Sequence, residues 1–350
     1  MTTDINLSAA ARECSISVIM PVYNGAATIG RSLAPLLAMQ RDAEVKEIIV
    51  VDDSSTDATV ELATALGVRI LHSDGRLGPG GARNVAAPAA IGEVLWFVDA
   101  DVVVRADAGR VLRRAFQRPD VTAVFGTYDD RPAATNFLSQ YKNLVHHHYH
   151  RANGGEAETF WAGCGAIRRD VFLDAGGFDV ARYPYPSIED IELGFRLRQQ
   201  GLCIVLDPAL QGTHLKEWRL ANLLHTEIFR RALPWSRLIH SRTGLLDTLN
   251  TGRAERWRAL LAIGLVASIP LAVAGRGPGW LPAALLIAAA GANAALLKLF
   301  SRRQGIWFAV KGLLFHQLYY LYGVTVFVWS WIEYRLSSIR GAMSGSSGSR

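Results

Sequence analysis

Short apolar runs alternate with polar, turn-rich stretches from the start of the chain to about Gly252. The run Val94–Val98 is continuous and apolar, which is typical of a strand covered on both faces, and Ser15–Tyr23 also reads as a strand. Stretches with helical spacing, such as NGAATIGRSLAPLLAM, follow the strands after a polar turn. Because strands that alternate with helices form parallel sheets with right-handed crossovers, this pattern predicts an α/β domain.

Several of the predicted strands end in polar side chains. In open parallel sheets the ligand site lies beyond the carboxyl ends of the strands. An isolated Asp after a strand is most often a turn former or a helix cap, but three such ends at one edge indicate a site. The residues concerned are Tyr23, Asn24, Asp52, Asp53, Asp99 and Asp101. Burying Asp99 and Asp101 without a partner would cost several kcal/mol, so a cation is expected beside them.

A different pattern begins after Trp257, where Leu, Ala, Ile, Val and aromatic residues dominate. The three apolar segments are Ala259–Gly275, Trp280–Phe300 and Ile306–Tyr334. Their lengths predict two to three membrane spans over residues 257–335, with aromatic belts at the interfaces. The third segment contains Lys311 and His316, so it either spans with these facing other helices or lies partly along the interface. A soluble helical bundle is the alternative.

The stretch between these halves, His214–Gly244, is amphipathic. Its apolar residues recur at helical spacing, opposed by Arg and Glu: Leu220, Leu223, Leu224, Ile228 and Leu233. This spacing predicts one or two helices in the lipid headgroup region, with a surface helix packed on the sheet as the alternative. The expected organisation is an α/β domain over residues 1–213, interfacial helices over 214–256, transmembrane helices over 257–335 and a disordered tail over 336–350.

The net charge of +6 comes largely from Arg beside the apolar half of the chain. This placement favours an anionic membrane surface, and not nucleic acid, as the partner of the basic residues. The arginines next to the apolar segments predict that the α/β domain faces the cytosol; they are Arg253, Arg256, Arg258, Arg302 and Arg303. Three scattered cysteines exclude a disulfide framework or a zinc site, and the first residues show no signal-peptide pattern.

Five segments between Ser15 and Gly201 resemble, in order, the signature segments of family 2 glycosyltransferases with the GT-A fold. They read SVIMPVYNGAATIGRSL, EIIVVDDSSTDAT, GPGGARNVAAPAAIGEVLWFVDADV, FWAGCGAIRRDVFLDAGGFD and SIEDIELGFRLRQQG. The resemblance implies a Rossmann-like, mostly parallel sheet flanked by helices. It also implies a UDP- or GDP-linked sugar donor, a divalent cation and inversion at the anomeric carbon.

The DAD segment at positions 99–101 resembles the metal-binding motif of this family. A hard cation held by carboxylate oxygens neutralises a diphosphate leaving group and orients the sugar. The resemblance implies that Asp101 contacts the metal directly and that Asp99 binds ribose or the metal through water. His214 is placed to complete the metal shell, with a structural histidine as the alternative. Mg²⁺ and Mn²⁺ both suit oxygen ligands, and an imidazole ligand favours Mn²⁺.

Other family positions concern the donor nucleotide. Pro21 and Tyr23 in MPVYN and Asp53 in VVDDSS match positions that hold the base, by aromatic stacking and by accepting from an N–H group. Arg83 in GARN matches a position near the base or the diphosphate, where guanidinium geometry suits the contact. The Gly-rich run before it matches neither a Walker A motif nor a dinucleotide fingerprint, and a mobile loop is the alternative.

The segment IEDIELG matches the ED motif of the family. Asp190 resembles the base that removes the acceptor hydroxyl proton, with Glu189 orienting the acceptor or tuning that pKa. The alternative is a helix start at which acidic residues are favoured by the helix dipole. Upstream, Trp161, Gly163 and Cys164 in FWAGCG are expected near the acceptor.

The run HHHYH at positions 146–150 lacks ligand spacing and a carboxylate partner. A polar surface or an acceptor-facing helix is therefore expected there, and not a metal site.

Together these features predict a metal-dependent inverting glycosyltransferase, multi-pass in the cell membrane, with its catalytic domain on the cytosolic face. The acceptor is expected to be a hydroxyl of a membrane lipid or a lipid-linked glycan. Transfer to polyprenyl phosphate is the main alternative, although an anionic phosphate acceptor needs no base. A polysaccharide synthase would carry a (Q/R)xxRW motif, whereas FRRALPW has the wrong spacing. A silent membrane scaffold is the third alternative, and the intact DAD and IED segments disfavour it.

Overall fold

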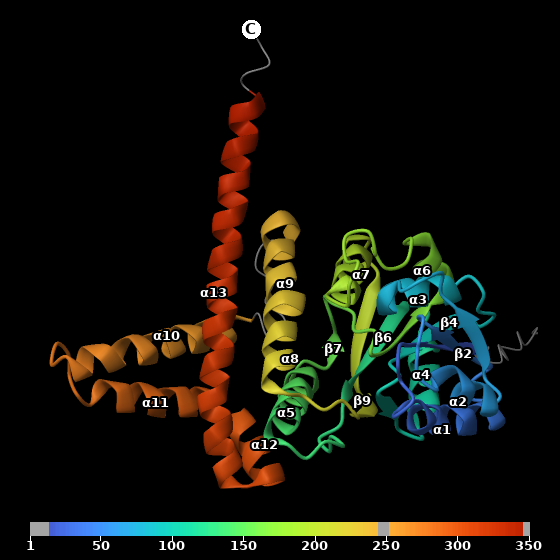
Figure 1. Cartoon of the computed structure of the whole chain (residues 1–350), viewed down its shortest axis with the longest axis horizontal. Coiled ribbons are helices and arrows are strands. Elements are labelled where there is room, and N and C mark those ends of the chain that lie inside the picture. The colour runs from blue at the N-terminus through green and yellow to red at the C-terminus, as the bar shows by residue number, and fades with distance from the viewer. Residues whose placement is uncertain (1–13, 244–251, 346–350) are drawn as a thin grey trace, which may run out of the picture. The chain divides into compact units, whose positions relative to one another are not determined.

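The computed structural model describes residues 14–243 and 252–345, which fall into two compact units (Figure 1). The first unit runs to Tyr128 and resumes over Gly154–Leu215. The second unit holds Asp129–Asn153 and the chain from Lys216 onward. The sequence analysis did not foresee that Asp129–Asn153 belongs with the C-terminal half.

A nine-stranded sheet forms the first unit, with the order β3-β2-β1-β4-β8-β6-β9-β5, and β7 pairs with β9 outside this path. The strands are β1 (Ile16–Val22), β2 (Glu47–Asp52), β3 (Arg69–His72), β4 (Val94–Val98), β5 (Val102–Val104), β6 (Val121–Tyr128), β7 (Gly155–Glu156), β8 (Cys164–Arg168) and β9 (Cys203–His214). The four neighbouring strands β3, β2, β1 and β4 pair in parallel, as the alternation with helices predicted. β8 then enters in the antiparallel direction between β4 and β6, so the sheet is mixed beyond β4.

Helices cover both faces of this sheet. They are α1 (Ile29–Arg41), α2 (Thr59–Ala65), α3 (Gly78–Ala86), α4 (Ala108–Phe116), α6 (Arg169–Asp174) and α7 (Glu189–Gln199). Figure 1 shows α1, α2 and α4 on one side of the sheet and α3, α6 and α7 on the other. Because neighbouring strand residues point to opposite faces, Trp96 joins the core of α1 and α4, whereas the Phe97 ring lies 5.2 Å from that of Phe172 in α6. Burial on both faces explains the continuous apolar sequence of β4, and the predicted α/β class is confirmed.

The second unit is helical. It consists of α5 (Phe137–Ala152), α8 (Leu220–His225), the π-helix η1 (Thr226–Ala232), α9 (Leu233–Leu238), the π-helix η2 (Ile239–Thr243), α10 (Arg253–Val273), α11 (Leu281–Ala292), α12 (Ala294–Gln304) and α13 (Ile306–Gly345). Aromatic side chains join α5 to the C-terminal helices: the Tyr141 ring lies 5.8 Å from that of Phe300 and 4.8 Å from that of Phe315. This packing is the reason that Asp129–Asn153 groups with the C-terminal half.

The predicted amphipathic stretch is helical from Leu220 to Thr243, in four consecutive pieces. Pro234 stands in the first turn of α9 and has no N–H group to donate to η1, which favours a local change of helical type. Arg237 of α9 forms two hydrogen bonds of 3.0 Å with Glu333 of α13. Residues 244–251 of the predicted interfacial stretch lie outside the described part of the chain.

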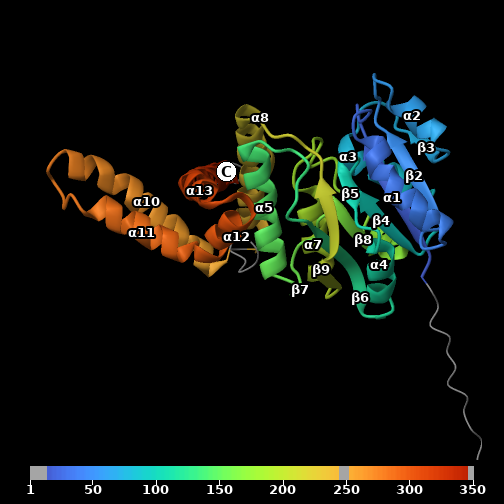
Figure 2. The same ribbon diagram turned by 90° about the horizontal axis from the view of Figure 1, so that it is seen from below.

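Among the described residues, only α10 is by itself long and apolar enough to cross a membrane. α11 and α12 reach that length only together, and a bend of 78° separates them. The expected span Trp280–Phe300 is therefore interrupted by this bend. In both views α10 and α11 lie side by side (Figures 1 and 2).

The third apolar segment lies inside α13, which does not meet the same criterion. The buried polar residues His316 and Gln317 lower the hydropathy of its central part. α13 continues to Gly345, so the predicted disordered tail is wrong for residues 336–345, where Leu336 and Ile339 extend the helical sequence. Residues 346–350 of that tail are outside the described chain.

Candidate active site

The acidic end of β4 is paired with an arginine from α3. The Arg83 guanidinium donates a hydrogen bond of 2.5 Å to the Asp99 carboxylate and also reaches the carbonyl oxygen of Ala162 at 3.4 Å. The Arg83 side chain is only 4% exposed, so its charge needs this acidic partner. Burial raises the pKa of Asp99 and outweighs the nearby Arg83, and the charges of Asp101 and Asp190 act in the same direction. The cation expected beside Asp99 is thus Arg83, from the protein itself.

Asp101 lies beside His214 at the start of β5. The His214 Nε2 atom is 3.5 Å from the Asp101 carboxylate, and the β5–β9 pairing places Val102 opposite His214. The backbone N–H of Leu215 also donates to the Asp101 carbonyl oxygen at 2.8 Å. One carboxylate oxygen and one imidazole nitrogen at this separation can bind the same divalent cation.

The Tyr128 ring holds the His214 imidazole in place. The two rings stack with centroids 4.3 Å apart and an interplanar angle of 11°. Trp161 in turn meets Tyr128 edge-on at 4.9 Å. Within the described residues no group of three or more His, Cys, Asp or Glu side chains is preformed as a metal site. A cation bound here would therefore need further oxygen ligands from a substrate or water, which fits a site for a metal–diphosphate complex.

The ED segment starts α7. Asp190 accepts a hydrogen bond of 3.0 Å from the backbone N–H of Ala162, and buried Glu189 accepts one of 2.8 Å from the N–H of Ser187. Burial and the charge of Asp190 raise the pKa of Glu189 to about 7. Asp190 is less buried than Glu189, so its carboxylate is the more accessible of the two.

Backbone groups of two adjacent residues, Ala162 and Gly163, connect the DAD and ED segments. The Ala162 N–H holds Asp190, while the Gly163 carbonyl oxygen accepts from the Asp99 N–H at 3.1 Å. A Cβ at Gly163 would meet the Trp161 ring at 2.6 Å, so glycine permits this close approach. Cys164 is fully buried opposite Val98 in the sheet, and burial raises the pKa of its thiol to about 12. No part of the Cys164 side chain reaches the surface, and its expected place in the acceptor region stays a prediction.

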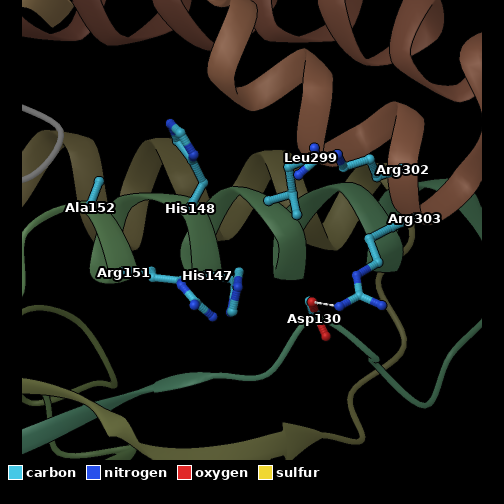
Figure 3. Close-up of a pocket in the computed structure, with 8 residues that line it drawn as sticks. All are labelled: Asp130, His147, His148, Arg151, Ala152, Leu299, Arg302 and Arg303. Carbon is cyan, nitrogen blue, oxygen red and sulfur yellow. Dashed lines mark hydrogen bonds and ion pairs between the residues drawn. The ribbon is translucent and has the colours of Figure 1, made fainter.

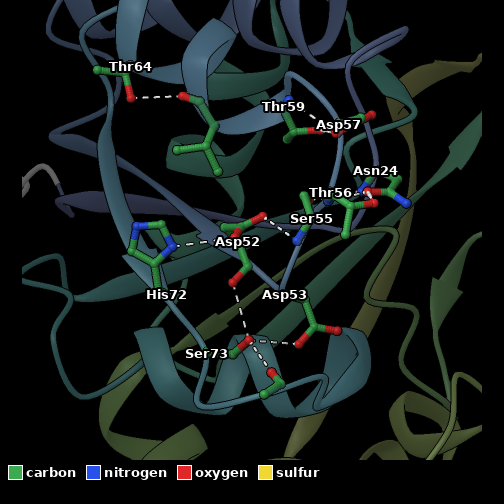
Figure 4. A network of polar contacts seen from close by, with 12 residues as sticks. Asn24, Asp52, Asp53, Ser55, Thr56, Asp57, Thr59, Thr64, His72 and Ser73 are labelled. Carbon is green, nitrogen blue, oxygen red and sulfur yellow. Dashed lines mark hydrogen bonds and ion pairs between the residues drawn. The ribbon is translucent and has the colours of Figure 1, made fainter.

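Asp53 anchors the Gly-rich loop before α3 (Figure 4). Its carboxylate accepts from the backbone N–H groups of Leu77 and Gly78 at 2.7 and 2.8 Å, and from the Ser73 hydroxyl at 2.9 Å. Neighbouring Asp52 accepts from the Ser55 N–H at 3.1 Å and lies 3.4 Å from His72. The sequence analysis did not foresee this anchoring contact, and base recognition by Asp53 stays a prediction.

The end of β1 combines an exposed ring with a tight turn. Tyr23 is exposed and carries the Arg76 guanidinium 3.7 Å above its ring. Asn24 has a φ of 51° and accepts from the Thr56 N–H at 2.8 Å, which joins the ends of β1 and β2. Pro21 is buried inside β1, opposite Val51, so it shapes the strand and offers no exposed surface.

The sequence analysis missed Tyr128, Ala162 and Arg76. Tyr128 had a usable signal, since it is a polar aromatic residue that ends an apolar strand. Ala162 acts through its backbone and Arg76 sits in a loop, so neither has a sequence signal. His147 and His150 of the HHHYH run are buried in α5, which belongs to the helical unit and not to the unit that carries this site.

Comparison with known proteins places these residues in context. Residues 17–176 match the family model described as Glycosyl transferase family 2. An uncharacterized protein of Mycobacterium tuberculosis is 31% identical over 209 residues, which cover 54% of this chain and 64% of that protein. The succinoglycan biosynthesis protein ExoO of Rhizobium meliloti is 39% identical over 108 residues, 30% of either chain. The chain thus spans less than two thirds of the length of both relatives.

A solved structure shows a similar fold over most of the chain. It is the mannosyltransferase PcManGT from Pyrobaculum calidifontis in complex with GDP-Man and Mn²⁺. The match has a TM-score of 0.53 and 20% identity, and it covers 90% of this chain and 87% of the other. This likeness confirms the predicted fold class.

Proposed function

Because residues 17–176 belong to glycosyl transferase family 2, we propose that the chain transfers a sugar from a nucleoside-diphosphate sugar to a hydroxyl group of a membrane lipid or lipid-linked glycan. One observation carries this proposal: five polar side chains from separate elements interact at one edge of the sheet. They are Arg83, Asp99, Asp101, Asp190 and His214. Such a cluster supplies a cation site, a positive charge and a candidate base within one site.

Asp101 and His214 are the residues we assign to a divalent cation. Their donor atoms, 3.5 Å apart, suit Mn²⁺ or Mg²⁺, and an imidazole favours the former. When bound, the cation would neutralise charge on the diphosphate leaving group. Asp99 is tied to Arg83, so we assign it to the ribose or to a water-mediated metal contact. The presence of Mn²⁺ with GDP-Man in PcManGT supports the choice of cation and donor class.

The donor nucleotide is assigned to the ends of β1 and β2. The exposed Tyr23 ring offers a stacking surface for the base, and Arg76 already occupies one of its faces with a positive charge. Asp53 fixes the loop that leads to Arg83, and in this position it can also accept from the edge of a base. Pro21 contributes through the backbone course of β1.

Asp190 is assigned as the base that takes the proton of the attacking acceptor hydroxyl. Its position is fixed by the Ala162 N–H, and its neighbour Glu189 keeps a proton up to about pH 7. Of the two carboxylates, the more accessible one, that of Asp190, is therefore the candidate base. A base on the face opposite the diphosphate gives inversion of the anomeric carbon. Trp161 and Gly163 flank this point and are assigned to the acceptor region.

We assign the acceptor to a membrane because the helical unit exposes large apolar side chains. On α10 these are Trp257, Leu260, Ile263, Val266, Ile269, Leu271 and Val273. On the amphipathic run, Leu220 and Phe229 are also exposed. Exposed apolar surface of this extent is typical of lipid contact. Together with the arginines next to the apolar helices, it supports a cell-membrane location with the site on the cytosolic side.

The metal assignment is tested with the full chain in detergent, by measuring hydrolysis of UDP-glucose and GDP-mannose with and without EDTA. We expect EDTA and Asp101→Asn each to lower hydrolysis by about 100-fold or more, since leaving-group charge is no longer neutralised. Asp120→Asn is the matched control, because Asp120 is exposed and pairs only with the surface residue Arg118. Hydrolysis that resists both EDTA and Asp101→Asn would overturn the assignment.

The acceptor class is tested separately with Asp190→Asn. Loss of a general base should lower transfer to a hydroxyl acceptor by about 100-fold or more, whereas an anionic polyprenyl phosphate acceptor should lose little rate. Mass spectrometry of products formed with each acceptor distinguishes the two. If the Asp190→Asn variant transfers sugar to polyprenyl phosphate as fast as the wild type does, the proposed hydroxyl acceptor is overturned in favour of the phosphate acceptor.

A further inference from the structure

The helical unit contains a cavity of about 610 Å³ between α5 and α12 (Figure 3). Its polar lining comprises His147, His148 and Arg151 from α5, Arg302 and Arg303 from α12, and Asp130. None of these residues belongs to the site at the sheet edge. The cavity is large enough for a small polar group with several hydrogen-bond acceptors.

The two walls of this cavity are held in fixed positions by contacts elsewhere along α5 and α12. The Tyr141 and Phe300 rings pack with centroids 5.8 Å apart, and Gln304 donates a hydrogen bond of 2.7 Å to Gln140. Phe300 is fully buried in this contact. The cavity is therefore a preformed feature of the helix pair, which lowers the cost of ordering its side chains around a ligand.

The lining is strongly basic. Asp130 is its only acid, and this acid forms an ion pair with Arg303. Across the described chain, neither Arg151 nor Arg302 has an acidic partner, so the lining has a net charge of +2 with neutral histidines. Burial lowers the pKa of His148, and the charges of Arg258 and His147 add to this effect. An anion would be attracted to such a cavity, and two unpaired guanidinium groups match phosphate geometry.

Apolar surface lies directly next to the arginines of α12. Ile306 and Trp307 begin α13, one residue after the end of α12, and are 63% and 77% exposed. On the other side, α12 continues the apolar helix α11, and Leu299 lies in the cavity wall itself. Basic side chains that adjoin exposed Trp and apolar helices are placed at the level of lipid headgroups.

We propose that the cavity between α5 and α12 binds the phosphate group of an anionic membrane lipid through Arg151 and Arg302. The lipid chains would lie along the exposed apolar side chains next to the cavity. This site is independent of sugar transfer, so it would fix the chain to anionic membranes whether or not a donor is bound.

The test measures lipid retention by native mass spectrometry of the full chain, released from micelles that contain phosphatidylglycerol or phosphatidylcholine. We expect wild-type protein to retain phosphatidylglycerol preferentially. Arg151→Gln and Arg302→Gln should each lower this retention by about tenfold, the effect of losing one charge-assisted hydrogen-bond pair. The matched control is Arg276→Gln, which removes the same charge at an exposed position outside the cavity and should behave as wild type.

A second arm separates a lipid from a soluble phosphate. Glycerol 3-phosphate and inorganic phosphate are added to the same micelles as competitors, and we expect neither to displace phosphatidylglycerol at equal concentration. If glycerol 3-phosphate binds through Arg151 and Arg302 while phosphatidylglycerol is not retained, the proposal of a lipid ligand is overturned. The ligand of the cavity is then a soluble phosphate compound. Equal retention of the two lipids by wild type, with no phosphate bound, overturns the proposal entirely.

Discussion

Arg83 and Asp99 each had a signal in the sequence, but their pairing did not. Asp99 ends an apolar strand, and Arg83 stands in a segment with helical spacing. The two meet only because α3 packs on the sheet and points the guanidinium at the end of β4. The carboxylate that lies beside the His214 imidazole is instead that of Asp101. Sequence can locate such charged residues, whereas the partner that neutralises each of them is fixed by the fold.

The sequence could not predict which residues act through their backbone, or which polar side chains are buried or already hydrogen-bonded within the protein. Ala162 holds Asp190 with an N–H group that any residue but proline could supply. Cys164 lies in a glycine-rich segment of the sequence, yet it is the first residue of β8 and is fully buried. Asp53 follows a strand and was predicted to bind a ligand through its carboxylate. In the structure the carboxylate oxygens already accept hydrogen bonds from three protein groups. Residue type alone does not distinguish these cases.

The raised pKa of Glu189 makes stability depend on pH. The folded chain keeps this proton up to about pH 7, whereas the free side chain has a pKa of 4.5. The stability that this difference contributes is complete below pH 4.5 and is lost as the pH rises through 7; a pKa difference of about 2.5 corresponds to about 3 kcal/mol. Glu189→Gln removes the ionisation and keeps an oxygen for the Ser187 N–H. We therefore expect its Tm to exceed that of wild type at pH 8 and to equal it near pH 4.5.

Thermal unfolding followed by tryptophan fluorescence at both pH values checks this expectation. Glu61→Gln is the control, because Glu61 is exposed on α2 and its removal should leave the pH profile unchanged. A Glu189→Gln profile that falls with pH exactly as far as wild type would contradict the assigned burial effect.

At the scale of elements, periodicity predicted which segments are strands and helices but not how they pair. The strands β1 to β4 follow the parallel rule that the alternation implies. β8 breaks it, since it pairs antiparallel with both of its neighbours, β4 and β6. The bend between α11 and α12 was missed for a related reason: hydropathy averages over twenty residues and does not register a turn inside an apolar segment.

Gly126 marks the place where two strands approach most closely. The register between β6 and β9 shifts between Phe125 and Thr127, and a Cβ at Gly126 would overlap the carbonyl oxygen of Leu210. Because that atom is backbone, it cannot move away without breaking the strand pair. We expect Gly126→Ala to destabilise the chain by about 2 kcal/mol or more, seen as a lower Tm.

The substitution Gly30→Ala should have the opposite effect on stability from Gly126→Ala. Gly30 lies in α1 with no atom near the position of a Cβ, so alanine should raise stability by about 0.5–1 kcal/mol. If both substitutions shift the Tm by similar amounts in the same direction, the close approach of the Leu210 carbonyl oxygen is not the reason that Gly126→Ala changes stability.

At the scale of the whole molecule, the change of composition near residue 257 indicated a second region of different chemistry. What composition could not show is that residues 129–153 belong to that region, because α5 mixes histidines and polar residues with its aromatics. The aromatic contacts of Tyr141 decide its place, and such contacts between segments far apart in the chain leave no trace in local periodicity.

The exposed apolar side chains of α10 predict how the chain partitions between water and lipid. Each large side chain left in water costs about 1–3 kcal/mol compared with its burial in lipid, and α10 exposes several of them. We expect the full chain to stay in the membrane fraction after extraction at alkaline pH, as measured by immunoblotting. A peripheral membrane protein released in the same extraction is the control. Recovery of the chain in the supernatant would contradict the membrane assignment.

The adjacent residues Ala162 and Gly163 link two parts of the proposed site through their backbone. The Ala162 N–H holds Asp190, the side chain assigned to accept a proton, and the Gly163 carbonyl oxygen holds the strand end at Asp99, which is assigned to the donor. A shift of this dipeptide would disturb bond making and bond breaking in concert. Damage introduced here and damage to Asp190 should therefore combine non-additively, with the double variant hardly slower than the worse single one.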